Sequence, residues 1–595
     1  MPILVLTDSR YSGNPFGCYL VEILRSEGLV EFEQTERAVL SAATSPQACL
    51  SAYDVVLMAE MDLDAAEEKL LREYVAAGGV LIAMRPDADL ADLFGIRVAG
   101  TGAEQVLQYF AVDAGAAGGS GIVETALQYH GRAADYSLEG AAPLAFLYDD
   151  RDTPSSRPAV TIHRTGDGSA VAFAFDLAKS IVLMRQGYPQ WNNTEGDDIP
   201  GYRPMDFFVR PDGTTLFDPK RLSIPQADEK QRFLANIVLR LIEKPLPRMW
   251  YLPGMHKTLM VNTGDGEGNY GPQLARVMDA CASYGGRFSV YLMNRDKALG
   301  IEKTTPEEET AWRAAGHEVG VHMYGGGKEG EGAYDALHEA YGKIVQDLKD
   351  KFGHGSRTAR NHSIDWTGWV DMAAIEAEFG TGMDVNFYHY LHFGDPTTTY
   401  GYFNGTGLPQ RFIDANGKIL PIYQATTQWP DEWFADKGMT AEQTVQIITT
   451  MFEAAEKGYY SAFVNNIHPP RYNDGDKITP VWPHAVWKYC RDKGIPSWSA
   501  EMLLDFVEAR NGATFENVTW HAAPEQGTRR LTFDFQTPTA GQDLTIMVPR
   551  AWSDRTLASV TANGETMDLS TETVKGIEYG MFTIKAAQAQ VVACY

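Results

Sequence analysis

The sequence lacks any apolar run long enough to cross a membrane. Its 595 residues contain no stretch of about 18 consecutive apolar residues, so no transmembrane helix is predicted. The first residues, Met1 to Asp8, carry neither a charged region nor a cleavage site, and they predict a β-strand rather than a signal peptide. We therefore expect no membrane insertion and a cytoplasmic protein as the sequence is written, or an exported one if a leader has been removed.

Cysteine and positive charge are both scarce. The five cysteines are scattered and none belongs to a Cys-x-x-Cys pair, which argues against a thiolate zinc site and a disulfide framework. The chain has 51 Lys and Arg against 78 Asp and Glu, a net charge of −27. This balance excludes a sequence-independent nucleic-acid binder and argues against docking on anionic lipid.

Residues 1–248 alternate between strand and helix patterns. Buried strands are expected at 3–7, 53–59 and 79–83, with a helix at 64–77 that ends at a Gly pair. This order predicts a parallel sheet covered on both faces and resembles the class I glutamine-amidotransferase-like fold. No Gly-x-Cys/Ser-x-Gly elbow follows a strand here, so we expect this α/β domain to be non-catalytic.

Residues 249–511 repeat strand and helix in longer units, which predicts a closed, distorted (β/α) barrel. One of its helices begins at a capping box, Thr305-Pro306-Glu307-Glu308. Residues 512–595 alternate apolar and polar side chains and contain the hairpin signal Asn563-Gly564. The tail is therefore predicted to be a small β-sandwich, and the whole chain an α/β protein of three domains.

Chemistry-bearing side chains follow five of the expected barrel strands. They are Asp265, His322, the pair Arg360 and His362, Asp384, and His468. Because active sites of parallel barrels form where strands end and loops begin, these groups are expected to meet at one mouth.

Several of these residues stand in ordered motifs. Thr263-Gly264-Asp265-Gly266-Glu267 follows the first strand, Gly316-His317-Glu318-Val319-Gly320-Val321-His322 the third, and Ile467-His468 the last. With Arg360 and Asp384 between them, this order resembles the NodB-homology (polysaccharide deacetylase) superfamily, carbohydrate esterase family four and its divergent relatives. The resemblance covers residues 250–510.

The resemblance implies roles for the motif residues. Asp265 would be the general base and His468 the general acid. Arg360 would hold Asp265 in place or act on Asp384, and Asp384 would support the site from behind by orienting Arg360. The family's second aspartate and its partner histidine are missing, since Gly266 and Gly326 stand at those positions. Glu267 and His362 would then complete a metal site with His322, and this donor set suits Zn²⁺. If Asp265 instead corresponds to the second aspartate of the family motif, it is itself a metal ligand, and Gly264 stands where the family has its base.

Aromatic side chains crowd the expected mouth, and those predicted to contact substrate are Trp366, Trp369, Tyr388 and Trp429. Sugar rings pack on aromatic faces, so the predicted substrate is an acetylated carbohydrate with an N- or O-linked acetyl group. The principal alternative is a catalytically inactive carbohydrate-binding protein that retains the barrel. A weaker one is an amidotransferase-type enzyme centred on the first domain, and the sequence leaves a homo-oligomer open.

Overall fold

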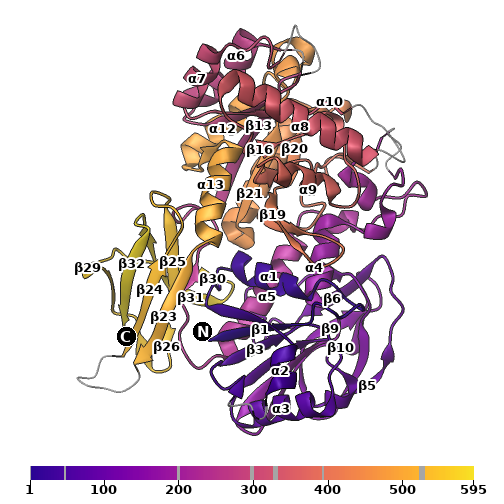
Figure 1. The fold of residues 1–595 in the computed structure, drawn as a ribbon, viewed down its shortest axis with the longest axis vertical. Helices are drawn as coiled ribbons and strands as arrows, with labels where there is room; N and C mark the ends of the chain where they lie inside the picture. Colours follow the sequence, from indigo (N-terminus) through magenta and orange to yellow (C-terminus); the bar gives the residue numbers. More distant parts are fainter. Residues whose placement is uncertain are drawn as a thin grey trace.

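The computed structural model contains three regions (Figure 1). It describes residues 2–43, 45, 48–196, 201–267, 269–294, 300–325, 333–391, 394–521 and 529–595. An N-terminal α/β region lies at one end of the molecule, a second α/β region at the other, and an all-β C-terminal region beside them (Figure 1). Among the described residues, no helix combines the length and the apolar character needed to cross a membrane.

The N-terminal region is built on a nine-stranded sheet in the order β2-β1-β3-β4-β11-β10-β9-β6-β7. The first five of these strands are parallel, which confirms the parallel start predicted from the sequence. They are β2 (Phe32–Glu36), β1 (Ile3–Thr7), β3 (Val55–Met58), β4 (Val80–Met84) and β11 (Gly168–Phe173). The antiparallel remainder is β10 (Pro154–Thr165), β9 (Ala142–Tyr148), β6 (Gln108–Val112) and β7 (Leu127–Tyr129).

The strands β1, β3, β4 and β11 are fully buried because helices cover the sheet. These helices include α1 (Leu20–Ser26), α3 (Ala65–Ala76), α4 (Leu177–Gln186) and α5 (Gln226–Leu241). The helix α3 begins at a capping box of Asp64 and Glu67. Burial raises the pKa of Cys18 to about 11, so this thiol is a weak nucleophile. The likeness of this region to amidotransferases stays a prediction.

The second region is built on a curled sheet in the order β18-β19-β17-β16-β15-β14-β13-β21-β20, with β22 (Ser497–Trp498) paired to β13. All these pairs are parallel except that of β18 with β19. The bounds are β18 (Gln410–Ile413), β19 (Ile419–Gln424), β17 (Met383–Asp384), β16 (Thr358–Ala359), β15 (Glu318–Val321), β14 (Phe288–Leu292), β13 (Thr258–Asp265), β21 (Ser461–Asn466) and β20 (Thr427–Pro430).

This sheet curls like half a barrel, where the sequence predicted a closed one. Two of its central strands, β16 and β17, are only two residues long. A single parallel bridge between Tyr388 and Thr427 brings the chain after β17 beside β20. The curl therefore turns the carboxyl ends of β13, β15, β16, β17, β20 and β21 toward one mouth.

Helices cover the outside of the curled sheet (Figure 1). They include α6 (Gly271–Ser283), α7 (Pro306–Ala314), α8 (Ala333–Phe352), α9 (Asp371–Glu378), α10 (Asp431–Asp436), α11 (Ala441–Ala454), α12 (Trp482–Lys493) and α13 (Ala500–Asn511). The predicted capping box of Thr305 and Glu308 is present at the start of α7.

The C-terminal region consists of a four-stranded sheet, β12-β25-β31-β30, a five-stranded sheet, β23-β24-β32-β28-β29, and the short pair β26 and β27. The bounds not given below are β23 (Thr514–His521), β24 (Arg530–Gln536), β26 (Ala551–Trp552), β27 (Arg555–Thr556), β28 (Ser559–Ala562), β29 (Glu565–Thr566), β30 (Ser570–Val574), β31 (Ile577–Ile584) and β32 (Gln588–Cys594). Strand β12 (Arg248–Met249) precedes the curled sheet in the chain and pairs with β25 (Leu544–Pro549), so the predicted boundary after residue 248 falls inside a strand. The hairpin at Asn563-Gly564 is confirmed, because Ala562 pairs with Glu565 and both loop residues have positive φ.

Candidate active site

Asp265 lies at the centre of the mouth formed by the curled sheet. It is the last residue of β13 and is buried, with 4 % of its surface exposed. Its Oδ1 accepts a hydrogen bond from Nη1 of Arg360 at 3.1 Å, and its Oδ2 accepts one from Nδ2 of Asn466 at 2.8 Å. Nε2 of His468 lies 3.6 Å from the same Oδ2. Both oxygens of this carboxylate are thus fixed in orientation.

Tight packing leaves no room for a second aspartate beside Asp265. A Cβ added at Gly264 would lie 2.3 Å from the carbonyl oxygen of Ile467. One added at Gly266 would lie 2.9 Å from the carbonyl oxygen of Tyr291. Substitution at either glycine would require the backbone to shift, so the next position available to a carboxylate is Glu267.

Arg360 holds Asp265 from a fully buried position after β16. Besides Asp265, its guanidinium donates to the hydroxyl of Thr427 at 2.7 Å and to the carbonyl oxygen of Val385 at 3.3 Å. It also lies between the rings of Tyr291 and Tyr388, 5.6 and 5.5 Å from their centroids. Burial alone would lower the pKa of Arg360, but the negative charge of Asp265 raises it. Arg360 is therefore a buried cation that pairs with Asp265.

Three predicted metal ligands meet beside this ion pair. Oε1 of Glu267 lies 3.3 Å from Nε2 of His322 and 3.3 Å from Nε2 of His362. The rings of the two histidines are 5.5 Å apart between centroids. Burial would raise the pKa of Glu267, but the hydrogen bond and charge of His322, with the charges of the other histidines, lower it to about 2. Glu267 is therefore a carboxylate at any ordinary pH.

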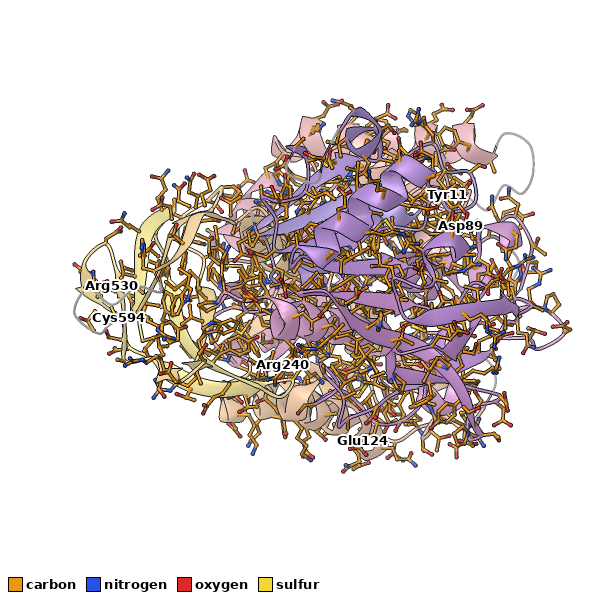
Figure 2. All side chains as sticks on the ribbon, turned by 90° about the horizontal axis from the view of Figure 1, so that it is seen from below. Tyr11, Asp89, Glu124, Arg240, Arg530 and Cys594 are labelled. Atoms are coloured by element: carbon orange, nitrogen blue, oxygen red, sulfur yellow. The ribbon has the colours of Figure 1, made fainter. Side chains whose placement is uncertain are left out.

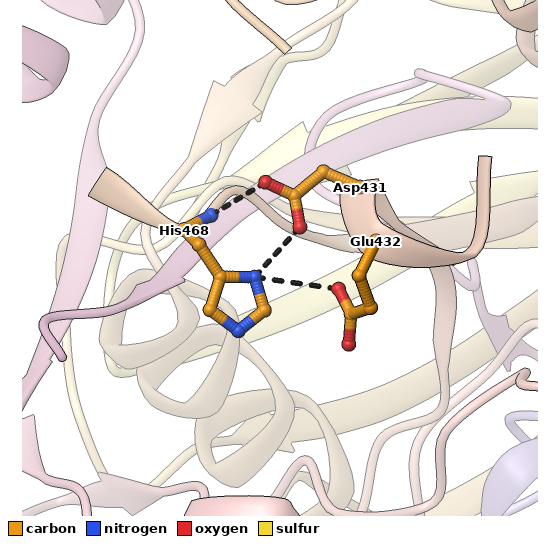
Figure 3. A group of neighbouring side chains, drawn as sticks. All are labelled: Asp431, Glu432 and His468. Carbon is orange, nitrogen blue, oxygen red and sulfur yellow. Dashed lines mark hydrogen bonds and ion pairs between the residues drawn. The ribbon is translucent and has the colours of Figure 1, made fainter. Parts of the chain in front are cut away.

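His468 lies on the other side of Asp265 with two carboxylates that the sequence analysis missed (Figure 3). Its Nδ1 is 2.6 Å from Oδ1 of Asp431 and 3.3 Å from Oε2 of Glu432, and its backbone N–H donates to Asp431 at 2.8 Å. Burial would lower the pKa of His468, but the charges of Asp431 and Glu432 raise it well above the ordinary value. The imidazole is therefore held as a cation with Nε2 turned toward Asp265.

These three residues, Asp431, Glu432 and His468, have ligand atoms within 4.8 Å of one another, a spacing that a metal ion can also use. The contact of 2.6 Å between Nδ1 of His468 and Asp431 is the length of a hydrogen bond between charged groups. The raised pKa of His468 puts a proton on that nitrogen, so the cluster acts as a histidine–carboxylate pair.

Asp384 lies behind the site rather than in it. It is fully buried, and burial raises its pKa to about 7. Its carboxylate accepts from the backbone and side chain of Asn386, whose Oδ1 accepts the backbone N–H of Asn361 at 2.7 Å. Asp384 thus supports the segment that carries Arg360, as a positioning residue.

A cavity of about 280 Å³ opens onto the site. Its lining from the second region is Asp265, Glu267, Asn361, Ser363, Ile364, Tyr388, Tyr390, Glu432, Asp436, His468 and Arg471. Arg203 and Met205 line it from the N-terminal region. The predicted substrate residues Trp366, Trp369 and Trp429 are buried and do not line it, since Trp369 donates to Gln186 and Trp429 stacks on Phe463. For these three, the prediction of a substrate-facing position is wrong because they pack in the core.

The structure thus brings together Asp265, Glu267, His322, Arg360, His362 and His468, all named from the sequence. Position 326, where the family's partner histidine is missing, lies outside the described residues. The missed groups are Asp431, Glu432 and Asn466. A signal for the first two was present, because Pro430-Asp431-Glu432 places acidic residues at a strand end that opens a helix.

No protein-family model and no curated protein sequence matches the chain. Among solved structures, the chain is similar to the carbohydrate deacetylase Agd3, at 10 % identity and TM-score 0.40 over 99 % of this chain and 98 % of that one. It is similar to a mutant of BA3943, a CE4 family pseudoenzyme with restored activity, at 13 % identity and TM-score 0.26 over 42 % of this chain and 67 % of that one.

It is also similar to a β-galactosidase from Rahnella sp. R3, at 19 % identity and TM-score 0.24 over 29 % of this chain and 28 % of that one. The chain spans less than a third of the length of the β-galactosidases that it matches. At these TM-scores, the similarities decide neither the fold nor the function of this chain, and its function has to be argued from the site.

Proposed function

We propose that this protein is a metal-dependent hydrolase that removes N- or O-linked acetyl groups from a carbohydrate. The observation that carries the proposal is the position of Glu267 Oε1, 3.3 Å from Nε2 of both His322 and His362. These three ligand atoms lie beside an Asp265–Arg360 ion pair on one side, with the His468–Asp431 pair beyond it.

The donor set fits a divalent metal, with Zn²⁺ the preferred ion. Two ligands bonded to zinc at roughly 2.0–2.1 Å in a tetrahedron are about 3.3 Å apart, which is the spacing of Glu267 from each histidine. Nδ1 of His322 is 2.9 Å from the carbonyl oxygen of Arg360, so Nδ1–H donates there, and Nε2, which faces Glu267, is the atom that would bind the metal in place of its proton. Such a metal supplies Lewis acidity and lowers the pKa of a bound water to about 7.

The chain's own residues supply the proton transfers. Arg360 orients Asp265 through its hydrogen bond to Oδ1, so that this carboxylate takes the proton from the attacking water. His468, charged by Asp431 and Glu432, gives its Nε2 proton to the departing amine or alcohol. The base and the acid line the same cavity, with Nε2 of His468 3.6 Å from Oδ2 of Asp265, an arrangement that suits hydrolysis of an acetyl amide or ester.

The cavity supports a carbohydrate as the carrier of the acetyl group. Tyr388 and Tyr390 offer ring faces, while the charged and amide side chains around them offer hydrogen bonds to hydroxyl groups. This combination of aromatic and polar lining favours a sugar ring over a purely apolar ester.

The test combines metal content with acetyl release from acetylated chromogenic esters and N-acetylated oligosaccharides. His322→Ala should lose the bound metal and with it the activity, whereas His338→Ala, on the surface of α8 beside Glu378, should retain both. Asp265→Asn should keep the metal and lose about 10²-fold or more in kcat.

Two outcomes would overturn parts of the proposal. Loss of metal in Asp265→Asn would make Asp265 a ligand, which would align it with the second aspartate of the family motif. Stoichiometric metal in the wild-type protein without turnover of any acetylated substrate would favour the inactive carbohydrate-binding protein instead.

A further inference from the structure

The turn that carries His362 has an unusual backbone. Ser363 and Ile364, which follow it, have φ +54° and +51°, so two consecutive residues other than glycine adopt the left-handed conformation. For a β-branched residue such as Ile364, this conformation is rare and unfavourable. Strained backbone of this kind persists only where the surrounding structure holds it, and such positions cluster at functional sites. Both residues line the active-site cavity, so the strained turn belongs to the site.

The turn gives the imidazole of His362 the orientation that the proposed metal site needs. The backbone N–H of His362 donates to the carbonyl oxygen of Met323 at 2.8 Å, and Nε2 lies 3.3 Å from Oε1 of Glu267. Oγ of Ser363 lies 3.2 Å from Nδ1 of the same ring. With Nε2 as the ligand atom, Nδ1–H donates to this hydroxyl, as the second nitrogen of a metal-bound histidine usually does to a neighbouring group.

Asn361, directly before His362, fastens the turn to the rest of the second region. It is fully buried, and its backbone N–H donates to Oδ1 of Asn386 at 2.7 Å. Its Nδ2 donates to the carbonyl oxygen of Asp365 at 3.1 Å and to Oε1 of Glu376 at 3.3 Å. The bond to Asp365 closes the turn on itself, whereas the bond to Glu376 ties it to α9. The strained backbone is therefore held from outside through the side chain of Asn361.

Glu376 is a fully buried side chain whose hydrogen bonds converge on this support. Its Oε1 accepts from Nδ2 of Asn361 and, at 3.1 Å, from Nδ2 of Asn386. Burial, together with the charge and the hydrogen bond of Asp384, raises the pKa of Glu376 well above its ordinary value. Glu376 is therefore a neutral carboxylic acid that shares its proton with Asp384. It does not line the active-site cavity, so any effect on the reaction must pass through the residues that it holds.

We propose that Glu376 is a positioning residue for His362 and acts through Asn361. It holds the strained turn of residues 361–364, so that Nε2 of His362 stays beside Glu267. Without the acceptor on Glu376, Nδ2 of Asn361 loses its bond to α9, and the turn relaxes toward an unstrained backbone. The imidazole then leaves the position that faces Glu267, and metal affinity falls. This role rests on the proposed metal site.

The test is titration of the metal-free full-length protein with Co²⁺, followed by the visible absorption of the bound ion. Glu376→Met keeps the length of the side chain but has no oxygen to accept from Asn361, and it should weaken Co²⁺ binding about tenfold or more. Glu376→Gln reproduces the neutral acid, with one acceptor and one donor in the same places, and should bind as the wild type does. Undiminished affinity in a folded Glu376→Met protein would refute the positioning role.

A double-mutant cycle tests the path through Asn361. Asn361→Ala should weaken Co²⁺ binding as Glu376→Met does, because each removes the same hydrogen bond. The protein with both substitutions should bind little more weakly than either single variant. If the two losses multiply, Glu376 acts by another path and the proposed link is wrong. Asn361→Ala breaks the bond from its other side, so it decides the question if Glu376→Met does not fold.

Glu31→Met is the matched control. Glu31 is also a fully buried glutamate, but its carboxylate accepts the backbone N–H of Val30 in the N-terminal region, which lies in front in Figure 2. This variant should bind Co²⁺ as the wild type does. Equal weakening in Glu31→Met and Glu376→Met would show that metal affinity follows general stability, which would refute the positioning role. Failure of the wild type to bind Co²⁺ would instead overturn the proposed metal site, and the role of Glu376 with it.

Discussion

At the scale of single residues, the candidate site follows a simple rule: each proposed catalytic residue is the last residue of a strand or lies just beyond it. Asp265 ends β13, and His322 and Arg360 directly follow β15 and β16. The sequence predicted these residues because a polar side chain after a buried apolar run is conspicuous. It did not predict Asp431 and Glu432, because the preceding strand β20 has four residues and ends in proline.

The pairing of His468 with Glu432 leads to a prediction about pH. The charge of Glu432 helps to raise the pKa of His468, and a protonated His468 is the form that donates. Activity should therefore fall as pH rises through that pKa. Glu432→Gln removes one of the two negative charges, so the alkaline limb of the kcat profile should move to lower pH by roughly one unit or more. The measurement is acetyl release across pH 5–10 for both proteins.

Asp436→Asn is the matched control for this experiment. Asp436 lies one helical turn further along α10 and contacts Tyr390 and Arg471 instead of His468. Its alkaline limb should coincide with that of the wild type. If both substitutions shift the alkaline limb equally, the shift comes from the summed negative charge around the cavity. The specific effect of Glu432 on His468 would then be refuted.

At the scale of helices and strands, the features that the sequence predicted well are local ones. The capping box at Thr305 requires only residues three positions apart, and it is present. The two-residue strands β16 and β17 have no local pattern, because they exist only through their neighbours in the curled sheet. The sequence therefore predicted a closed barrel, whereas the structure has a curled, partly open sheet.

The cap of α7 can be tested with one chemical change made at two positions. Thr305 at the N-cap accepts the backbone N–H of Glu308 at 3.1 Å, so Thr305→Ala should destabilise the protein by about 1 kcal/mol. Thr310 is exposed within the same helix, where alanine is the better helix former, so Thr310→Ala should stabilise it by a few tenths of a kcal/mol. Urea denaturation measures both. If both substitutions changed the free energy of unfolding in the same direction, the cap at Thr305 would make no contribution to stability.

At the scale of the whole molecule, the three regions are joined by buried polar contacts that no sequence pattern marks. Glu22 of α1 pairs with Arg411 of β18 at 2.6 Å, and Glu27 pairs with Arg248 at 3.0 Å. The backbone N–H of Trp366 donates to the carbonyl oxygen of Tyr202 at 2.9 Å, beside the segment that brings Arg203 and Met205 to the active-site cavity. The sequence treated these regions as independent because the partners lie hundreds of positions apart. In the structure, the N-terminal region completes the site of the second.

A further junction is centred on Glu229 of α5. Its Oε1 lies 2.6 Å from Nζ of Lys575, in the C-terminal region, and 2.8 Å from Nη1 of Arg232. Arg232 in turn donates to the carbonyl oxygen of Tyr459 in the second region at 2.8 Å. Glu229 and Arg232 are fully buried, so removing the carboxylate takes from two buried cations the ion-pair partner that both contact directly.

Glu229→Gln should therefore lower the free energy of unfolding by about 3–5 kcal/mol, whereas an exposed junction should matter far less. Glu572 provides that comparison, because it pairs with Lys257 at 3.0 Å between the C-terminal and second regions while 35 % of its side chain is exposed. Glu572→Gln should cost less than about 1 kcal/mol. Because Glu229 ties all three regions together, wild-type unfolding in urea, followed by circular dichroism and tryptophan fluorescence, should show one shared transition. Separate unfolding transitions for the two probes in the wild type would mean that the regions fold independently. An equal loss of unfolding free energy in the two variants would mean that the junction at Glu229 only brings the surfaces of the regions into contact.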